Sequence, residues 1–241
     1  LAPAARRRRG AGPGRRAVSA DLATLERVLG ARKSVRAFLP TPVPRERLAR
    51  VFAAAQRAPS WCNTQPWRVV VTEPPRTDVV RDALVAAARG GLPSPDVPFP
   101  MDYPEPYLAH RRACGFALYG AMGIARDDKS RRYDAWLRNY QIFDAPHLAV
   151  VGVDRRLGPY ALIDVGVWLG QLLAAFTADG LAACSMASIA AYPKVLREQL
   201  GFAPEVDLLF GIAIGLEDEA SPINQFRTAR DPVEANVTFL A

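Results

Sequence analysis

The sequence is poor in the residues that build metal centres and hydrolytic sites. Its 241 residues include three cysteines and two histidines. Cys62, Cys114 and Cys184 lie far apart and form no Cys-x-x-Cys pair, and only His110 and His147 could join them, so no metal site is predicted. No Ser-His-Asp arrangement and no convincing pair of carboxylates indicates hydrolysis. Scattered thiols in odd number favour a reducing compartment, and we expect a cytoplasmic protein.

Long hydrophobic runs and a glycine fingerprint for dinucleotides are also missing. No stretch approaches the roughly 18 uninterrupted apolar residues of a membrane span, so we expect no membrane partner. A glycine-rich run from Gly10 to Gly14 lacks a preceding strand and matches the dinucleotide fingerprint weakly. Half of the residues are hydrophobic and 23% are charged, which suits a soluble chain of one large or two small domains.

The first twenty residues contain no acidic side chain. Six arginines lie there, Arg6 to Arg9, Arg15 and Arg16, and subtracting their charge from the net charge of +7 leaves +1. A near-neutral remainder argues against a nucleic-acid surface in the folded part. Because Ala, Pro, Gly and Arg bury too little apolar surface to fold, we predict a disordered basic arm over residues 1–20 and one domain over 21–241. A transit peptide and a nucleic-acid-binding arm are the alternatives.

A polar turn at residues 58–67 separates an apolar helix from an apolar strand. Pro59 and Pro66 fix their own φ angles and remove two backbone donors, so neither helix nor strand can continue through the turn. Its polar side chains are Ser60, Asn63, Thr64 and Gln65. A rigid turn of this kind suits a planar polar ligand, although Asn and Gln also stabilise turns without any ligand.

Two clusters of cations stand near opposite ends of the chain. The first holds Arg32, Lys33 and Arg36 around Ser34, and the second holds Arg227 and Arg230. Arginine forks match phosphate oxygens in pairs, so the two clusters together could clamp a phosphate group. Taken alone, each cluster could equally be solvated surface charge.

The three stretches together resemble the nitroreductase family of flavin mononucleotide (FMN) oxidoreductases. The motifs are Arg-Lys-Ser-Val-Arg at 32–36, Pro-Ser-x-x-Asn-x-Gln-Pro-Trp at 59–67 and Arg-Thr-x-Arg-x-Pro at 227–232. The resemblance implies an α+β fold with a central, mainly antiparallel sheet flanked by helices, and a homodimer with flavin at its interface. It also implies ping-pong transfer of hydride from NADH or NADPH, through flavin N5, to nitroaromatic, quinone or activated-alkene acceptors.

The resemblance also assigns the cofactor-binding residues. They are Arg32, Lys33, Ser34, Arg36, Pro59, Ser60, Asn63, Gln65, Met186, Ala187, Ser188, Arg227 and Arg230. Arg32 and Ser34 would bind the phosphate and ribityl oxygens, and Arg36 would lie near the pyrimidine edge of the ring. Residues 186–188, taken as a loop, would bring a backbone amide to N5. No catalytic side chain is implied, because the flavin carries the electrons. The alternatives are a flavin-consuming or dehydrogenating relative and a non-catalytic flavin-binding protein.

Hydrophobic periodicity predicts the elements around these motifs. Helices are expected from Asp21, as capping acid, to about Gly30, and after Pro44, at 76–89, within 106–140, and at 160–179 and 193–200. Strands are expected at 67–72, 148–153 and 207–215. A final β segment is expected at 237–240, and the resemblance implies that it reaches across to the other subunit. The segment 160–179 is apolar nearly all round and is therefore expected to be buried on most faces, as in a dimer core.

Overall fold

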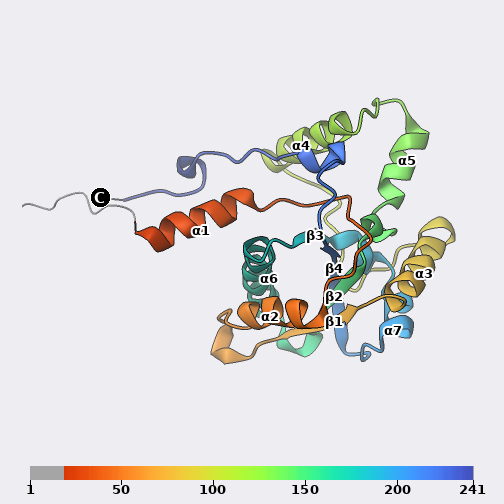
Figure 1. Cartoon of the computed structure of the whole chain (residues 1–241), viewed down its shortest axis with the longest axis horizontal. Helices are drawn as coiled ribbons and strands as arrows, with labels where there is room; N and C mark the ends of the chain where they lie inside the picture. Colours follow the sequence, from red (N-terminus) through yellow and green to blue (C-terminus); the bar gives the residue numbers. More distant parts are fainter. Residues whose placement is uncertain (1–18, 241) are drawn as a thin grey trace, which may run out of the picture.

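Four strands form one antiparallel sheet at the centre of the fold (Figure 1). The computed structural model describes residues 19–240. In spatial order the strands are β1 (Trp67–Thr72), β2 (His147–Asp154), β4 (Val206–Gly215) and β3 (Ala182–Met186). Every neighbouring pair is antiparallel, which confirms the predicted sheet.

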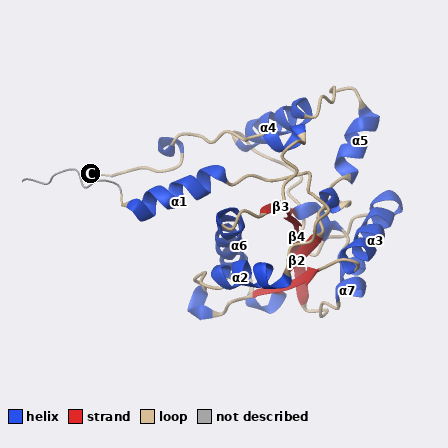
Figure 2. Cartoon of the chain, in the orientation of Figure 1, coloured by secondary structure: helices blue, strands red, loops and turns tan. Residues whose placement is uncertain are grey.

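Residues 19–240 also form seven α-helices (Figure 2). They are α1 (Ala20–Ala31), α2 (Arg45–Ala55), α3 (Arg76–Gly90), α4 (Tyr107–Ala121), α5 (Lys129–Leu137), α6 (Tyr160–Ala178) and α7 (Pro193–Leu200). Side chains alternate between the two faces of the sheet, as a strand requires. Along β2, Ala149 and Val151 belong to the core beneath α2 and α6, whereas Leu148 and Val150 belong to the core beneath α3 and α7. The chain therefore has an α+β fold with helices on both faces of the sheet.

Within the single described chain helix α6 is buried on one face, and burial of its other faces in a dimer core stays a prediction. Trp168, Leu172 and Phe176 are buried against the sheet and α2. Leu162, Ile163 and Val167 on the other face are 40–61% exposed, because no element of the described chain covers them. The helix is long and apolar enough to span a membrane by composition, a test that core helices also pass. Within the fold its inner face packs as a core helix does.

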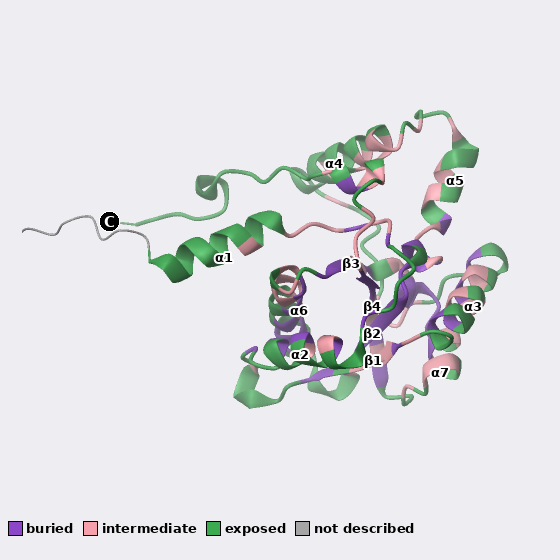
Figure 3. Ribbon diagram, in the orientation of Figure 1, coloured by how far each residue is buried: buried purple, intermediate pink, exposed green. Residues whose placement is uncertain are grey.

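Helix α1 leaves the body of the molecule beside the C-terminal segment (Figure 1). Ser19 caps it by accepting a hydrogen bond from the backbone N–H of Leu22 at 3.1 Å, so the cap lies two residues before the expected Asp21, which is inside the first turn. A hydroxyl just before the helix reaches its free N–H groups better than a side chain already inside it. The helix buries no residue, and Figure 3 shows its exposure. The rest of the predicted basic arm, residues 1–18, lies outside the described residues.

The segment 237–240, predicted as a β segment that reaches across to the other subunit, forms no strand within the single described chain. Val237 to Leu240 have no strand partner and are exposed, with Phe239 at 86% and Leu240 at 93%. A β-strand needs a neighbouring strand for its backbone hydrogen bonds, and this segment extends away from the sheet with α1 (Figure 1).

His147 connects the start of β2 to the loop before α2. Its side chain is almost fully buried, and Nε2 accepts a hydrogen bond from the backbone N–H of Val43 at 2.8 Å. Nδ1 lies 3.1 Å from the carbonyl oxygen of Thr72, to which it donates. Burial lowers the pKa of His147, so the ring is neutral in the folded protein.

Candidate cofactor site

A basic cavity of about 450 Å³ lies where the loop after α1 meets the segment that follows β4. We call it the cradle. Its walls are Leu29, Gly30, Arg32, Lys33, Ser34, Arg36, Phe226, Arg227, Thr228 and Arg230. The structure thus brings the two predicted cation clusters together from opposite ends of the sequence, and no acidic side chain is among these residues.

The loop after α1 is held against the free edge of β3. Ser34 forms a parallel bridge with Ala183, and the backbone N–H of Val35 donates to the Ala183 carbonyl at 3.2 Å. Val35 itself is buried in the core. Cys184, the next residue of β3, is buried, and burial raises the pKa of its thiol. The nearby Arg36 opposes this effect but is the smaller cause, so the thiol stays protonated. The cradle therefore has a rigid floor provided by the sheet.

Asn224 joins the two halves of the cradle, and the sequence analysis missed it. The side chain is 1% exposed, and its Oδ1 accepts from the Arg36 backbone N–H at 2.8 Å. Its Nδ2 donates to the carbonyls of Ala37 at 2.8 Å and Asp218 at 2.9 Å. No pattern around residue 224 distinguishes this amide from one in an exposed loop, because two of its three partners, Arg36 and Ala37, are 188 and 187 positions away.

Lys33 already has protein partners for its charge. Its ammonium group pairs with Glu217 and donates to the Asn224 carbonyl at 2.9 Å. The side chain is mostly buried as a result. Lys33 therefore fixes the cradle wall, and its predicted contact with a cofactor stays a prediction.

The four arginines of the cradle have no acidic partner within the described residues. Arg230 donates to the hydroxyl of Thr228 at 2.6 Å, and Arg227 donates to the Asn224 carbonyl at 3.2 Å. Arg36 makes a weak bond to the Ser34 carbonyl at 3.3 Å. Arg32 forms no ion pair within residues 19–240. Hydrogen bonds to neutral oxygens orient these side chains but leave their positive charge available to an anion.

The polar turn at 58–67 is ordered by a buried carboxylate on α6. Both side-chain oxygens of Asp164 accept from the Trp61 backbone N–H at 3.1 Å. A short 3-10 helix, Trp61–Asn63, follows, and Asn63 has a φ of 56° in the left-handed region. Gln65 has a φ of 46°, and its backbone N–H donates to the Ser60 hydroxyl at 3.0 Å. The sequence analysis did not predict this contact. The signal that could have indicated it is Asp164 itself, an acidic residue within the apolar pattern of α6.

The turn and the cradle do not meet within one chain. None of Pro59, Ser60, Asn63 and Gln65 lines the cradle. In Figure 1 the turn that follows α2 lies well apart from the loop after α1, which provides one side of the cradle. The side chains of Ser60 and Gln65 form hydrogen bonds within the turn. This agrees with the alternative that the polar residues of the turn stabilise it without any ligand.

Residues 186–188 are not the loop that was predicted. Met186 ends β3, pairs with Gly211 of β4 and is buried in the core. Ala187 and Ser188 begin a 3-10 helix, Ala187–Ala191, which packs its Ile189 directly over Gly211. Small residues show no clear hydrophobic periodicity, so the sequence pattern did not predict this strand. The buried hydroxyl of Ser188 has no hydrogen-bond partner in the described chain.

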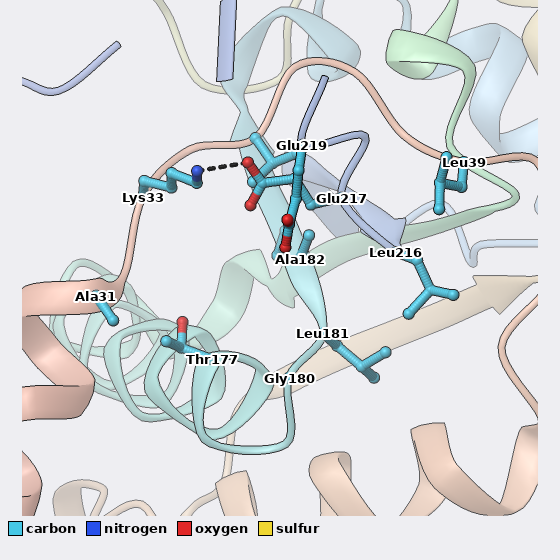
Figure 4. Close-up of a pocket in the computed structure, with 12 residues that line it drawn as sticks. Ala31, Lys33, Leu39, Thr177, Gly180, Leu181, Ala182, Leu216, Glu217 and Glu219 are labelled. Atoms are coloured by element: carbon cyan, nitrogen blue, oxygen red, sulfur yellow. Dashed lines mark ion pairs between the residues drawn. The ribbon is translucent and has the colours of Figure 1, made fainter. Parts of the chain in front are cut away.

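Two further cavities adjoin the loop after α1. One, of about 540 Å³, has Lys33 in its wall together with Glu217, Glu219 and the end of α6 (Figure 4). Its acidic side chains make it unlike the cradle. The other, of about 410 Å³, lies between α4, α5 and the 3-10 helix Pro222–Gln225, and we call it the α4–α5 cavity. Arg36 lines both the cradle and the α4–α5 cavity.

Comparisons with known proteins agree over most of the chain. The sequence profile described as the nitroreductase family matches residues 29–216. Nitroreductase NfnB from Mycolicibacterium smegmatis is 34% identical over 221 residues, which cover 91% of this chain and 94% of that protein. A 4-nitrobenzoate reductase from a Nocardioides species is 33% identical and covers 88% of each chain. The crystal structure of the FMN-dependent NfnB from Mycobacterium smegmatis in complex with NADPH superposes with a TM-score of 0.87 at 34% identity, over 92% of this chain and 100% of that one.

Proposed function

The chain belongs to the nitroreductase family, and we propose that it is an FMN-dependent oxidoreductase that reduces nitroaromatic compounds with NADH or NADPH. Quinones and activated alkenes are further acceptors in this proposal, and residues 21–241 are its FMN-binding domain. The observation that carries the proposal is the cradle, in which four arginines without acidic partners converge from both ends of the chain. The names of the similar proteins support the same cofactor, donor and acceptor class.

The cradle fits the phosphate end of FMN. Arg32, Arg227 and Arg230 provide paired N–H donors and uncompensated positive charge for a phosphate dianion. The Ser34 hydroxyl lies in the same wall, where it can bond a ribityl oxygen. FMN when bound supplies two-electron hydride chemistry at its N5 atom. The residues of the chain bind and orient it, and none is needed as an acid or base.

Arg36 supports the redox chemistry through its charge. It lines the cradle next to Ser34, with its backbone fixed by Asn224 and its guanidinium free of any acid within the described residues. A fixed cation near the pyrimidine edge of a flavin stabilises the negative charge that reduction adds there. Arg36 would therefore make the bound flavin easier to reduce.

We propose a homodimer in which the polar turn of one subunit contacts the flavin held in the cradle of the other. The turn and the cradle are both ordered but lie apart in a single chain. Apolar side chains on α1, on the outer face of α6 and on the C-terminal segment are exposed. Large exposed apolar areas of this kind typically mark an interface. Free thiols at Cys62 and Cys114 agree with the further proposal of a cytoplasmic location.

The test begins with the visible absorption spectrum of the purified protein. Two flavin bands, bleached without oxygen by NADH or NADPH and restored by a nitroaromatic compound, are the expected result. A protein that binds no flavin even when FMN is supplied would refute the proposal. Flavin that stays oxidised in the presence of both nicotinamides would favour the non-catalytic alternative.

The oligomeric proposal has its own experiment. Ile163→Glu places a charge on the exposed apolar face of α6, where the single chain has room for it. We expect sedimentation velocity to change from dimer to monomer and flavin to be lost at the same time. A monomeric variant that retains FMN would place the flavin site within one chain.

A further inference from the structure

The α4–α5 cavity combines apolar walls with two cations at its edge. Its apolar side chains are Leu118, Ala121, Met122, Ala135, Phe143, Pro222 and Ile223. Its charged side chains are Arg36 and Arg138, with the amide of Asn139 beside them, and no carboxylate is among its lining residues. A volume of about 410 Å³, with mostly apolar lining and a few convergent polar groups, is typical of a small-molecule site.

Arg138 is held at this cavity by residues on the following segment. Its Nη2 lies 2.8 Å from Asp144 Oδ2, and its Nη1 donates to Gln141 Oε1 at 3.2 Å. Asp144 is mostly exposed, so water weakens this ion pair and a part of the positive charge of Arg138 remains effective toward the cavity.

The segment that positions these groups has an unusual backbone. Ile142, Phe143 and Asp144 have φ angles of 57°, 52° and 64°, although none of them is glycine. Non-glycine residues in this region are strained, and conformations of this kind concentrate at functional sites. Here the segment places Phe143 in the cavity wall and Asp144 beside Arg138.

We propose that the α4–α5 cavity binds the acceptor and that Arg138 makes it selective for aromatic compounds that carry a carboxylate. This proposal rests on the proposed function, and Arg36 connects the two because it lines both the cradle and this cavity. The apolar walls contact the ring of the acceptor, and the guanidinium of Arg138 attracts the carboxylate. A neutral ring of the same shape makes the apolar contacts but lacks the attraction to the Arg138 guanidinium.

The experiment compares 4-nitrobenzoate with 4-nitrobenzamide, which has nearly the same shape without the charge. In Arg138→Gln the ratio of kcat/KM for the carboxylate to that for the carboxamide should fall about fivefold, the effect of one partly exposed charged hydrogen bond. In Asp144→Asn the ratio should rise about twofold, because Arg138 loses its competing partner. Asparagine also tolerates the left-handed backbone at this position. Lys129→Gln, at the start of α5 and outside the cavity, is the matched charge control and should leave the ratio unchanged.

A binding measurement separates this proposal from the proposed function. In equilibrium dialysis the wild-type protein should retain benzoate more than benzamide, and Arg138→Gln should lose the difference. An unchanged ratio and unchanged benzoate binding in Arg138→Gln would overturn the inference even if both nitro compounds are reduced. A rise in KM for NADPH in that variant, with the acceptor ratio unaltered, would also overturn it, since the cavity would then bind the donor. If neither nitro compound is reduced, the proposed function fails and the benzoate measurement still decides the specificity of the cavity.

Discussion

Replacing Asn224 by alanine should destabilise the protein and weaken flavin binding together. The substitution removes three buried side-chain hydrogen bonds, to the backbones of Arg36, Ala37 and Asp218. Each bond contributes about 1 kcal/mol net, and the part-buried N–H and carbonyl groups left behind lose their partner, so we expect a loss of about 3 kcal/mol in the free energy of unfolding. The two halves of the cradle would also lose their common support.

The assay is urea unfolding of the flavin-free protein, followed by an FMN titration. The unfolding midpoint should fall without a change in the slope m, and the dissociation constant for FMN should rise. Gln225→Ala is the control, because its exposed neighbouring amide makes a single side-chain hydrogen bond, to Glu219. Asn224→Asp should be at least as damaging, since it turns a donor toward two carbonyls into an acceptor. If Asn224→Ala unfolds at the same urea concentration as Gln225→Ala, the amide does not join the cradle.

Three further predictions concern the cradle, a buried histidine and the polar turn. Arg32→Ala should weaken FMN binding by about tenfold or more, as expected for one charged hydrogen bond, whereas Arg89→Ala on α3 should not alter a fluorescence titration with FMN. The lowered pKa of His147 means that, below about pH 6.5, the unfolded chain binds more protons than the folded chain. The free energy of unfolding is therefore greatest above that pH and falls on acidification, with a slope of at most about 1.4 kcal/mol per pH unit. Thermal unfolding should lose this dependence in His147→Gln and keep it in His110→Gln. Asp164→Ala should lower the free energy of unfolding in urea by about 2 kcal/mol, because the Trp61 N–H loses a charged acceptor. An unchanged unfolding midpoint would mean that water replaces the carboxylate.

The sequence predicted the elements whose apolar residues repeat with a clear period. The strand at 67–72 has the predicted bounds, and the strands at 148–153 and 207–215 are each extended by one or two residues. Strand β3 has the sequence Ala-Ala-Cys-Ser-Met. Both of its faces are mostly buried, so its residues do not alternate between apolar and polar, and no strand pattern was visible there. Periodicity therefore predicts strands that are half covered, and it misses a short strand in a small-residue segment.

The candidate site was predictable where chemistry repeats within a few residues. The clusters at 32–36 and 227–230 predicted two sets of cations that act together, and the structure brings both into the wall of the cradle. Asn224 was not predictable, because an amide that bonds to three backbone groups is chosen by tertiary geometry and not by its neighbours in sequence. The same holds for Arg138, whose partner Asp144 lies on a backbone segment with an unexpected left-handed conformation.

The apolar pattern of α6 was interpreted as that of a helix in a dimer core, and a single chain covers only part of such a helix. The pattern records every surface that is removed from water in the working protein, whether by the same chain or by another. Within residues 19–240 only one face of the helix is covered, while Ile163 and Val167 remain exposed. The exposed stripe on α1 and the unpaired segment at 237–240 show the same excess of apolar side chains over available partners. The proposed homodimer would cover all three surfaces at once, which is why a single substitution at Ile163 should affect both assembly and flavin binding.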